Sequence, residues 1–375
     1  MRVALVNVTT TTKVGGVEQF VVQLAHSLAA NGVDVSIFGG MCERQIPVSE
    51  AVDVHTSRYI DRAALRRIPL VRRQYAATKL IERLSFDAGA ANAIRRGGYD
   101  IVHIHKPFDF PLASWLRRRT DARIVYSSHG RDFFVWDRRF VRDVAVITAC
   151  SAYNAAEVRE RYGRESRIVY NGVDTDHFRP VARDNVWRAS LGIDDDPLAL
   201  WVGRLERWKG TIDAVRALAL MRAPTHLVIV GDGPERTRLT DAAVALGIPK
   251  RVHLVGSQSH DTLRMMYASS DVVLGTSFAN ETFGMALAEA SACARPIVAT
   301  NFGGFPEVVQ HERTGRLVPP RDPTALAAAI ERIVAHPDEA RVFGAAGRAF
   351  VCDRFAWPVV TERIIATYHE ALDAH

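Results

Sequence analysis

The most regular feature of the chain is a repeat of short apolar runs, each followed by a polar or glycine-bearing turn and then by a longer amphipathic segment. The first repeat predicts a strand over Met1–Val8, a loop over 9–16, a helix over Val17–Asn31 and a second strand over Val33–Phe38. Gly32 stands just past the helix, where glycine commonly adopts a left-handed conformation. A strand, a helix and a second strand in this order predict a doubly wound α/β sheet, whose ligands bind at the carboxyl ends of its strands.

The same pattern continues to the end of the chain. In the first half it predicts strands over Asp100–His105, Ile124–Gly130, Val144–Ser151 and Arg167–Asn171. In the second half it predicts strands near residues 198, 227, 252, 272, 297 and 317, a helix over Pro323–Val334 with Asp322 as its cap, and a last helix over Pro358–Leu372. The segment 171–180 is then a linker, and the chain is expected to have two domains.

Composition is consistent with this organisation. The chain has 375 residues, of which 48% are hydrophobic and 24% charged, enough for two globular domains. No run of about 18 apolar residues occurs and the apolar start is too short for a signal peptide, so we expect a cytoplasmic protein. The four cysteines are scattered, which argues against a disulfide framework or a zinc site. The net charge of +6 suits anionic ligands.

Candidate chemistry begins with the segment Glu281–Glu289, in which two carboxylates flank a small turn that opens an apolar helix. If the whole segment were helical, the two acids would lie about 12 Å apart along the axis and about 80° apart around it. Free backbone N–H groups near Thr282, Phe283 and Gly284 would form a helix N-terminus that favours a phosphate. The segment could therefore hold a sugar hydroxyl, a diphosphate and a ribose diol. The alternative is an amphipathic helix with two solvated glutamates.

Two cations follow one of the apolar strands. Arg204 and Lys209 lie in the sequence Gly-Arg-Leu-Glu-Arg-Trp-Lys-Gly that begins at Gly203. A guanidinium offers a planar fork of donors and an ammonium a compact charge, a combination suited to a diphosphate. A solvated basic turn is the alternative. Later strands also end in glycine, at Gly231 and Gly256, so the order of strand, ligand turn and helix recurs.

Together these motifs resemble the retaining glycosyltransferases of the GT-B fold, in the large bacterial class called group 1 or family four. The resemblance extends from residue 15 to about residue 320. It rests on Gly15-Gly-Val-Glu18, Asn171-Gly-Val-Asp174, Gly203-Arg-Leu through Lys209-Gly, Gly231-Asp-Gly-Pro-Glu235, Glu281–Glu289, Gly303-Gly-Phe-Pro-Glu307 and Gly315-Arg-Leu-Val-Pro319. Each segment alone is weak, and their common order identifies the family without identifying the sugar or the acceptor.

The resemblance implies two Rossmann-like doubly wound parallel-sheet domains that face a cleft. We expect an acceptor-binding domain over 1–176 with a return helix over 357–375, and a domain over 177–356 that binds a nucleotide-sugar donor. The resemblance also implies that the backbone of Gly15 and Gly16 binds the donor phosphates. A plain tight turn is the alternative, and the G-x-G-x-x-G spacing of a dinucleotide-binding site is absent.

For the donor, the resemblance assigns stabilisation of the diphosphate to Arg204 and Lys209, the hydroxyls of the transferred sugar to Glu281, and the ribose diol to Glu289. Base recognition is expected through the backbone near 256–258. The other expected donor-binding residues are Gly203, Gly231, Gly256, Ser257, Thr282, Phe283 and Gly284.

Histidines mark two strands of the first domain. His103 and His105 alternate along one strand and so share a face; with no third ligand nearby in the sequence, packing is favoured over zinc binding. His129 ends the next strand, and the resemblance places such a histidine at the donor sugar and acceptor. The alternative is a loop histidine bonded to a backbone carbonyl. On the acceptor side we expect Lys106, Arg131 and Asn171.

The implied reaction moves a hexosyl group from a nucleoside diphosphate sugar to a hydroxyl of a small molecule or glycan, with retention at the anomeric carbon. A UDP-sugar is the first expectation and GDP-mannose the second, in natural-product, polysaccharide or glycolipid biosynthesis. No cofactor or essential metal is expected, because Asp194-Asp-Asp196 precedes a proline and a strand and so indicates a solvated turn. Two alternatives are a sugar-nucleotide epimerase of the same fold and a non-catalytic nucleotide-sugar-binding protein.

One segment differs from an ordinary surface. Between residues 58 and 83 seven arginines and one lysine are interleaved with apolar residues. Such a composition could rest on anionic lipid at the inner membrane face or attract an anionic acceptor. The alternative is a solvated, arginine-rich helix pair broken at Pro69. Nucleic acid is not expected as a partner, because the aromatic residues are not arranged as a stacking platform.

Overall fold

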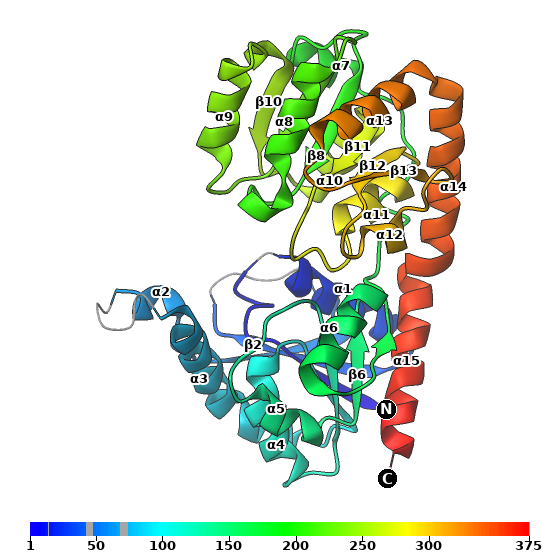
Figure 1. Ribbon diagram of the computed structural model, residues 1–375. Coiled ribbons are helices and arrows are strands. Elements are labelled where there is room, and N and C mark those ends of the chain that lie inside the picture. The colour runs from blue at the N-terminus through cyan, green and yellow to red at the C-terminus, as the bar shows by residue number, and fades with distance from the viewer. Residues whose placement is uncertain (14, 43–47, 68–73, 375) are drawn as a thin grey trace. The chain divides into compact units, whose positions relative to one another are not determined.

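A computed structural model divides the chain into two units, each built around one parallel sheet (Figure 1). The structure describes residues 1–13, 15–42, 48–67 and 74–374. The first unit comprises Met1–Gly172 together with Trp357–His375, and the second comprises Val173–Ala356. The sequence placed the corresponding boundaries after residues 176 and 356. Two doubly wound sheets confirm the expected fold class.

The sheet of the first unit has the strand order β3-β2-β1-β4-β5-β6-β7, and every neighbouring pair is parallel. Its strands are β1 (Arg2–Val6), β2 (Asp34–Gly40), β3 (Val52–Ser57), β4 (Ile101–Ile104), β5 (Arg123–Ser128), β6 (Val146–Ala149) and β7 (Arg167–Ile168). Strands β2 and β3 extend the sheet beyond β1 on one side, and β5, β6 and β7 extend it beyond β4 on the other. The adjacent strands β1 and β4 therefore form the topological switch point of the sheet.

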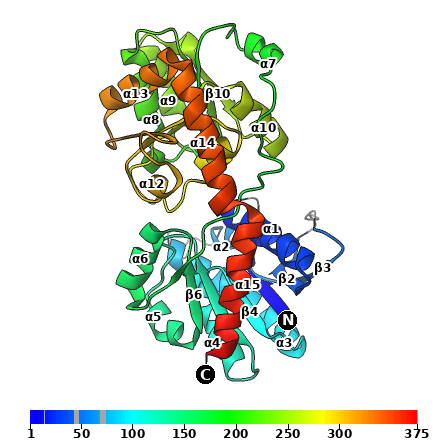
Figure 2. The same cartoon turned by 90° about the vertical axis from the view of Figure 1, so that its right-hand side faces the viewer.

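The helices of the first unit cover both faces of this sheet. They are α1 (Gly16–Ala30), α2 (Arg62–Leu65), α3 (Tyr75–Arg96), α4 (Phe110–Arg117), α5 (Asp137–Phe140), α6 (Ala152–Tyr162) and α15 (Trp357–Asp373). Helices α1 and α15 pack on the face that carries Val3 and Leu5 (Figure 2). Helices α3 and α4 pack on the face that carries Ala4 and Val6. Because successive side chains along β1 point to opposite faces of the sheet, this strand contributes to a hydrophobic core on each face.

The sheet of the second unit has the order β10-β9-β8-β11-β12-β13 and is also parallel throughout. Its strands are β8 (Leu198–Val202), β9 (His226–Val230), β10 (Val252–Gly256), β11 (Val272–Gly275), β12 (Ile297–Thr300) and β13 (Gly315–Val318). All six lie where the apolar runs predicted them. Here β8 and β11 are the neighbours at which the direction of the connections reverses.

The helices of the second unit are α7 (Asn185–Ser190), α8 (Thr211–Leu220), α9 (Arg236–Ala245), α10 (His260–Ser269), α11 (Met285–Ala292), α12 (Phe305–Val308), α13 (Pro323–Ala335) and α14 (Pro337–Phe355). Helices α8, α9 and α13 share one core with the sheet, and α14 packs against α11. Asp322 caps α13 as predicted, because its carboxylate accepts a hydrogen bond of 2.9 Å from the backbone N–H of Ala325.

Strand β3 and helix α14 are among the elements that the sequence analysis did not predict. Strand β3 is an edge strand whose residues after Val52 are largely exposed, so it lacks an apolar run. Helix α14 carries two buried glycines, Gly344 and Gly347, and the Cβ of an alanine in place of Gly344 would lie 2.2 Å from the carbonyl oxygen of Ala294. Close helix packing through small residues therefore replaces the regular apolar stripe that identifies a helix in a sequence.

Candidate active site

The switch point of the second sheet brings together the two loops that carry the strongest sequence motifs. One loop follows β8 and contains residues 203–210, and the other follows β11 and contains residues 276–284. In an open parallel sheet, ligands bind at the carboxyl ends of the strands where the connections diverge. The predicted donor residues on these loops therefore lie at the position that the topology itself favours for a ligand.

Lys209 and Glu281 meet at this point. The Lys209 Nζ donates a hydrogen bond of 2.7 Å to Glu281 Oε2, and their side chains are 20% and 10% exposed. Ser277 Oγ donates to the same carboxylate oxygen at 2.9 Å. A carboxylate that accepts two hydrogen bonds is fixed in orientation, and its other oxygen, Oε1, accepts none from the residues that the structure describes and stays available to a ligand. The sequence predicted both residues, and the structure adds Ser277.

The backbone around Lys209 explains why it reaches Glu281. Residues Arg207–Lys209 form a single 3₁₀ turn that ends at Gly210, whose φ is +66°. A Cβ at Gly210 would lie 2.1 Å from the carbonyl oxygen of Thr276, so only glycine allows the two loops to approach this closely. Thr276 Oγ1 donates a hydrogen bond of 2.7 Å to the carbonyl oxygen of Lys209 and so links the two loops directly.

Arg204 is exposed on the same loop. Among the residues that the structure describes, its side chain makes no hydrogen bond or ion pair, whereas the next residue, Leu205, is fully buried. The backbone N–H of Leu205 donates to the carbonyl oxygen of Asp232 at 2.9 Å. Arg204 therefore projects from an anchored backbone with its guanidinium donors available to an anion.

The glycines at Gly203 and Gly231 have a structural role that the sequence did not reveal. Gly231 has a φ of +124°, and a Cβ there would lie 1.9 Å from the carbonyl oxygen of Gly203. The two loops after β8 and β9 are therefore in direct backbone contact. Whether these glycines also touch a ligand stays a prediction.

Gly256 and Ser257 lie on the loop that follows β10. Asp232, on the neighbouring loop after β9, accepts hydrogen bonds of 2.9 Å from both the backbone N–H and the Oγ of Ser257. These bonds lower the pKa of the Asp232 carboxyl below its usual value. Asp232 thus fixes the segment expected to recognise the base, a role that the sequence prediction missed because the contact joins two separate strands.

The segment from Glu281 to Glu289 is not one helix, which corrects the geometry expected for it. Helix α11 begins only at Met285, and its N-cap, Gly284, has a φ of +103°. The estimate of about 12 Å along a common helix axis therefore does not apply. Phe283 is 2% exposed and packs against Phe355 at 5.1 Å between ring centroids, so its side chain belongs to the core. A ligand could use only the backbone here.

Glu289 lies in the second turn of α11. Tyr267 Oη donates a hydrogen bond of 3.0 Å to Glu289 Oε2. Burial raises the pKa of Glu289 to about 7, and the hydrogen bond from Tyr267 opposes that rise. Tyr267 comes from α10 and was not predicted, since nothing in the sequence links it to Glu289.

In the first unit, the half-buried His129 lies beside two buried histidines, His103 and His105, at the carboxyl ends of β4 and β5. His105 Nδ1 lies 3.3 Å from His129 Nε2, and the rings of His103 and His105 lie 4.3 Å apart, as their alternation predicted. Burial lowers the pKa of His129 to about 3; the charge of Lys106 adds to this and a hydrogen bond with Asn171 opposes it. The structure therefore brings His129, Lys106 and Asn171 together, and their role at an acceptor stays a prediction.

The sequence analysis found no third ligand near His103 and His105, but the fold places His129 beside them. Even so, among the residues that the structure describes, no group of three histidine, cysteine or acidic side chains is arranged to hold a metal ion.

Lys106 shares a carboxylate with a lysine that the sequence prediction did not select. Lys106 Nζ lies 3.2 Å from Asp132 Oδ2, and Lys79 Nζ is paired with Asp132 Oδ1. Burial lowers the pKa of Lys79 to about 8. Burial also favours a higher pKa for Asp132, but the two ammonium groups outweigh it and bring that pKa to about 2. Arg131 is turned toward α6, where its Nε lies 2.5 Å from Glu157 Oε1.

Of the cations in the basic segment 58–83 that the structure describes, two are buried, whereas Arg58, Arg66 and Arg67 are exposed. Arg83 is 2% exposed and its Nη1 lies 3.1 Å from Asp109 Oδ2, while Lys79 is bound to Asp132. These two cations are therefore buried in ion pairs rather than displayed to lipid. Pro69, the expected break between helices, lies outside the described residues. Within the described part of the chain, no helix has the length and apolar character needed to cross a membrane.

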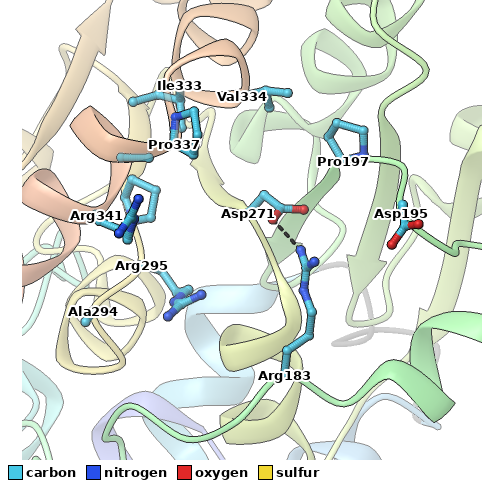
Figure 3. Close-up of a pocket in the computed structure, with 12 residues that line it drawn as sticks. Arg183, Asp195, Pro197, Asp271, Ala294, Arg295, Ile333, Val334, Pro337 and Arg341 are labelled. Carbon is cyan, nitrogen blue, oxygen red and sulfur yellow. Dashed lines mark hydrogen bonds and ion pairs between the residues drawn. The ribbon is translucent and has the colours of Figure 1, made fainter.

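A separate cavity lies at the opposite edge of the second sheet. It has a volume of about 350 Å³, and Pro197, Asp271 and Pro296, which directly precede strands, contribute to its wall (Figure 3). Arg183 is bonded to Asp271, and Arg295 donates to backbone carbonyl oxygens of Ala268, Ser270 and Cys293. None of the predicted donor residues lines this cavity.

Comparison with known proteins adds a third line of observation. The sequence signature described as "Glycosyl transferases group 1" matches residues 184–350, and that described as "Glycosyltransferase Family 4" matches residues 14–177. The chain is 30% identical to the D-inositol 3-phosphate glycosyltransferase of Acidothermus cellulolyticus, over 96% of this chain and 86% of that protein.

Two further similarities are to a mannosyltransferase and to a solved structure. The GDP-mannose-dependent alpha-(1-6)-phosphatidylinositol monomannoside mannosyltransferase of Mycolicibacterium smegmatis is 33% identical over 70% of this chain and 74% of its own length. The crystal structure of Anabaena HepE with UDP and glucose has a TM-score of 0.80 and 20% identity, over 98% of this chain and 99% of that one. This last similarity concerns the fold.

Proposed function

The chain belongs to the group 1, family 4 glycosyltransferases of the GT-B fold, and we propose that it transfers a hexosyl group from a nucleoside diphosphate sugar to an acceptor hydroxyl with retention. The observation that carries the proposal is the contact of Lys209 with Glu281 at the switch point of the second sheet. It joins a cation suited to a diphosphate with a carboxylate suited to sugar hydroxyls.

Departure of the diphosphate places negative charge where this site has its donors. Arg204 and Lys209 would stabilise that charge together with the backbone N–H groups at the start of α11, which is electrostatic catalysis in a preorganised site. Lys209 holds Glu281 before the donor arrives. Glu281 Oε1, which accepts no hydrogen bond from the described residues, would then accept from the sugar hydroxyls, and neither group has to act as a nucleophile.

Glu289 would accept hydrogen bonds from the ribose diol. Its partial exposure on α11 and its bond to Tyr267 support this role, since a ligand hydroxyl could reach the carboxylate. The loop 256–258, fixed by Asp232, would contact the base. Gly15 and Gly16 belong to the first unit, and we propose that their backbone binds the donor phosphates.

The donor proposed first is a UDP-sugar. Support comes from the HepE structure, which contains UDP and glucose. The mycolicibacterial relative is named as GDP-mannose-dependent, so GDP-mannose is the second candidate. Binding of UDP-, GDP-, ADP- and TDP-sugars, measured by thermal shift on the full chain, separates these donors, and a shift with GDP-mannose alone would overturn the UDP proposal.

The acceptor proposed is a phosphorylated hydroxyl compound. The name of the Acidothermus relative includes an inositol phosphate and that of the mycolicibacterial relative a phosphatidylinositol. In this chain Lys79 and Lys106 both face Asp132, giving two cations to one carboxylate at the carboxyl edge of the first sheet. A phosphate could be bound there by charge-assisted hydrogen bonds. Arg131, His129 and Asn171 complete the proposed acceptor side.

Product analysis tests the reaction. Incubation with UDP-glucose and D-inositol 3-phosphate, followed by NMR of the product, should show an α-linked glucosyl group, as in the donor. A β linkage would contradict retention. An altered nucleotide sugar formed without acceptor would identify an epimerase instead, and binding without any product would indicate a non-catalytic protein. We propose that no metal is required, so that transfer should persist in excess chelator.

A further inference from the structure

His129 is held from two sides within the first unit. The ring of Phe20 packs edge-on against it, with 4.8 Å between centroids, and His105 lies on another side with its ring nearly parallel, at 5.6 Å. Phe20 itself packs against Trp357 of α15. The orientation of the His129 imidazole is therefore set by packing, and its Nε2 is directed at His105 Nδ1, 3.3 Å away.

One of these two nitrogens must carry the proton of the hydrogen bond. His105 is buried, and its other nitrogen, Nε2, has no hydrogen-bond partner among the described residues. If His129 donated, His105 would have to carry its own proton on that unpartnered Nε2, and a buried N–H without an acceptor costs its full desolvation. If His105 Nδ1 donates, the unpartnered Nε2 is a bare acceptor, which folded proteins tolerate more readily.

The contacts of His103 do not change which nitrogen carries the proton of this hydrogen bond. Although its ring lies against that of His105 at a tilt of 33°, its Nδ1 is bonded to Tyr368 Oη at 2.8 Å and its Nε2 to Ser127 Oγ at 2.7 Å. Both nitrogens of His103 are therefore occupied by hydroxyl groups, and neither reaches His105 Nε2. The cationic groups near His105 are Lys106 and Arg83, and with the other two histidines they disfavour an added positive charge on its ring.

We propose that His105 is a positioning residue that donates its Nδ1 proton to His129 Nε2 and thereby fixes His129 as the neutral tautomer protonated on Nδ1. His129 then presents an N–H to Asn171 or to a ligand oxygen, and it has no free lone pair with which to accept a proton. In the reaction it would donate a hydrogen bond to a hydroxyl or phosphate oxygen. It would not serve as the base that deprotonates the acceptor. This part rests on the proposed function.

Nitrogen NMR of the full chain labelled with ¹⁵N-histidine tests the tautomer directly and does not require activity. The signals of His129 and His105 are assigned by their loss in His129→Gln and His105→Phe. The expected spectrum of the wild type shows both rings neutral, each with its proton on Nδ1, between pH 6 and pH 8. A proton on His129 Nε2, or a charged ring in that range, overturns the proposal. If one of these variants fails to fold, a second substitution at the same position, His129→Asn or His105→Asn, provides the assignment.

Kinetics then separate positioning from structural support. In His105→Phe, kcat should fall roughly tenfold or more through loss of one hydrogen bond, with the donor KM nearly unchanged. His105→Asn, whose amide N–H can occupy the place of Nδ1, should recover most of the rate. His103→Gln is the matched control and should leave the His129 tautomer unaltered. Equal kcat values for His105→Phe and wild type would overturn the positioning role. The two proposals can fail separately. If the tautomer is as expected but no donor and acceptor pair gives turnover, the proposed function is wrong and the hydrogen bond from His105 to His129 is still supported.

Discussion

The Nζ of Lys209 and the Oε2 of Glu281 lie 2.7 Å apart, although seventy-two positions separate them in the chain. The contact joins the loops that leave β8 and β11, the two strands at which the second sheet reverses its connections. A cation and a carboxylate held together at a switch point can act on adjacent parts of one ligand. In the proposed reaction those parts are the diphosphate and the sugar that it releases.

Removal of the ammonium should therefore impair the chemical step. Lys209→Ala is expected to lower kcat by about 10²- to 10³-fold, the effect of removing one donor from a preorganised site. Arg207→Ala is the matched control, because Arg207 is an exposed cation on the same 3₁₀ turn. Glu281→Gln should also lower kcat, and the double variant should lose less than the product of the two effects, because the residues are in contact. A kcat within a few-fold of wild type in Lys209→Ala would show that the assigned role is wrong.

Donor binding should depend on pH through Glu289. Because burial raises its pKa from 4.5 to about 7, the folded protein favours the neutral carboxyl, and this contribution to stability is lost as pH rises through 7. The ribose diol requires the ionised form, so the affinity for a UDP-sugar, whose doubly esterified diphosphate does not titrate in this range, should weaken as pH falls below about 7. Calorimetric titrations between pH 5.5 and 8.5 measure this, and Glu289→Gln should abolish the dependence. Tyr267→Phe removes the hydrogen bond to Glu289 and should shift the pH midpoint of donor affinity upward. An unchanged midpoint would contradict the importance of that hydrogen bond.

The contact between the loops after β8 and β9 predicts a stability effect. Gly231→Ala is expected to lower the free energy of unfolding by about 3 kcal/mol or more, since it adds a steric overlap to the cost of a positive φ. Gly247→Ala is the control: its φ is +73°, but its Cβ would meet no atom within 4 Å, so about 1–2 kcal/mol should be lost. Urea unfolding of both variants gives the comparison. Equal losses would mean that the overlap relaxes without cost.

Recognition of an acceptor phosphate predicts a separate effect in the first unit. Lys79→Met should raise the KM for D-inositol 3-phosphate about tenfold or more, while the KM for the donor changes little. Because the pKa of Lys79 is lowered to about 8, its charge is lost as pH rises through 8, and the acceptor KM of the wild type should rise over the same range. Lys250→Met removes an exposed lysine of the second unit and serves as the control. An unaltered acceptor KM in Lys79→Met would exclude this lysine from the acceptor site.

The sequence predicted the sheets well because their strands are short apolar runs with glycine at their ends. It missed β3, an exposed edge strand, and α14, whose packing depends on Gly344 and Gly347. It selected Lys209 and Glu281 because residue type and chain order carry that information. It could not find Tyr267, Asp232 or Lys79, because each acts through a contact with a distant part of the chain. The helical spacing of Glu281 and Glu289 was wrong because Gly284 takes a positive φ and starts the helix late.

In the proposed reaction, the carboxyl edge of the second sheet binds the diphosphate of a nucleotide sugar. A crystal structure of the full chain with UDP would show whether it does. We expect Arg204, Lys209 and the backbone N–H groups at the start of α11 to donate hydrogen bonds to the diphosphate, and Glu289 to accept from the ribose hydroxyls. A diphosphate bound elsewhere, with Arg204 and Lys209 both out of hydrogen-bonding range, would contradict it.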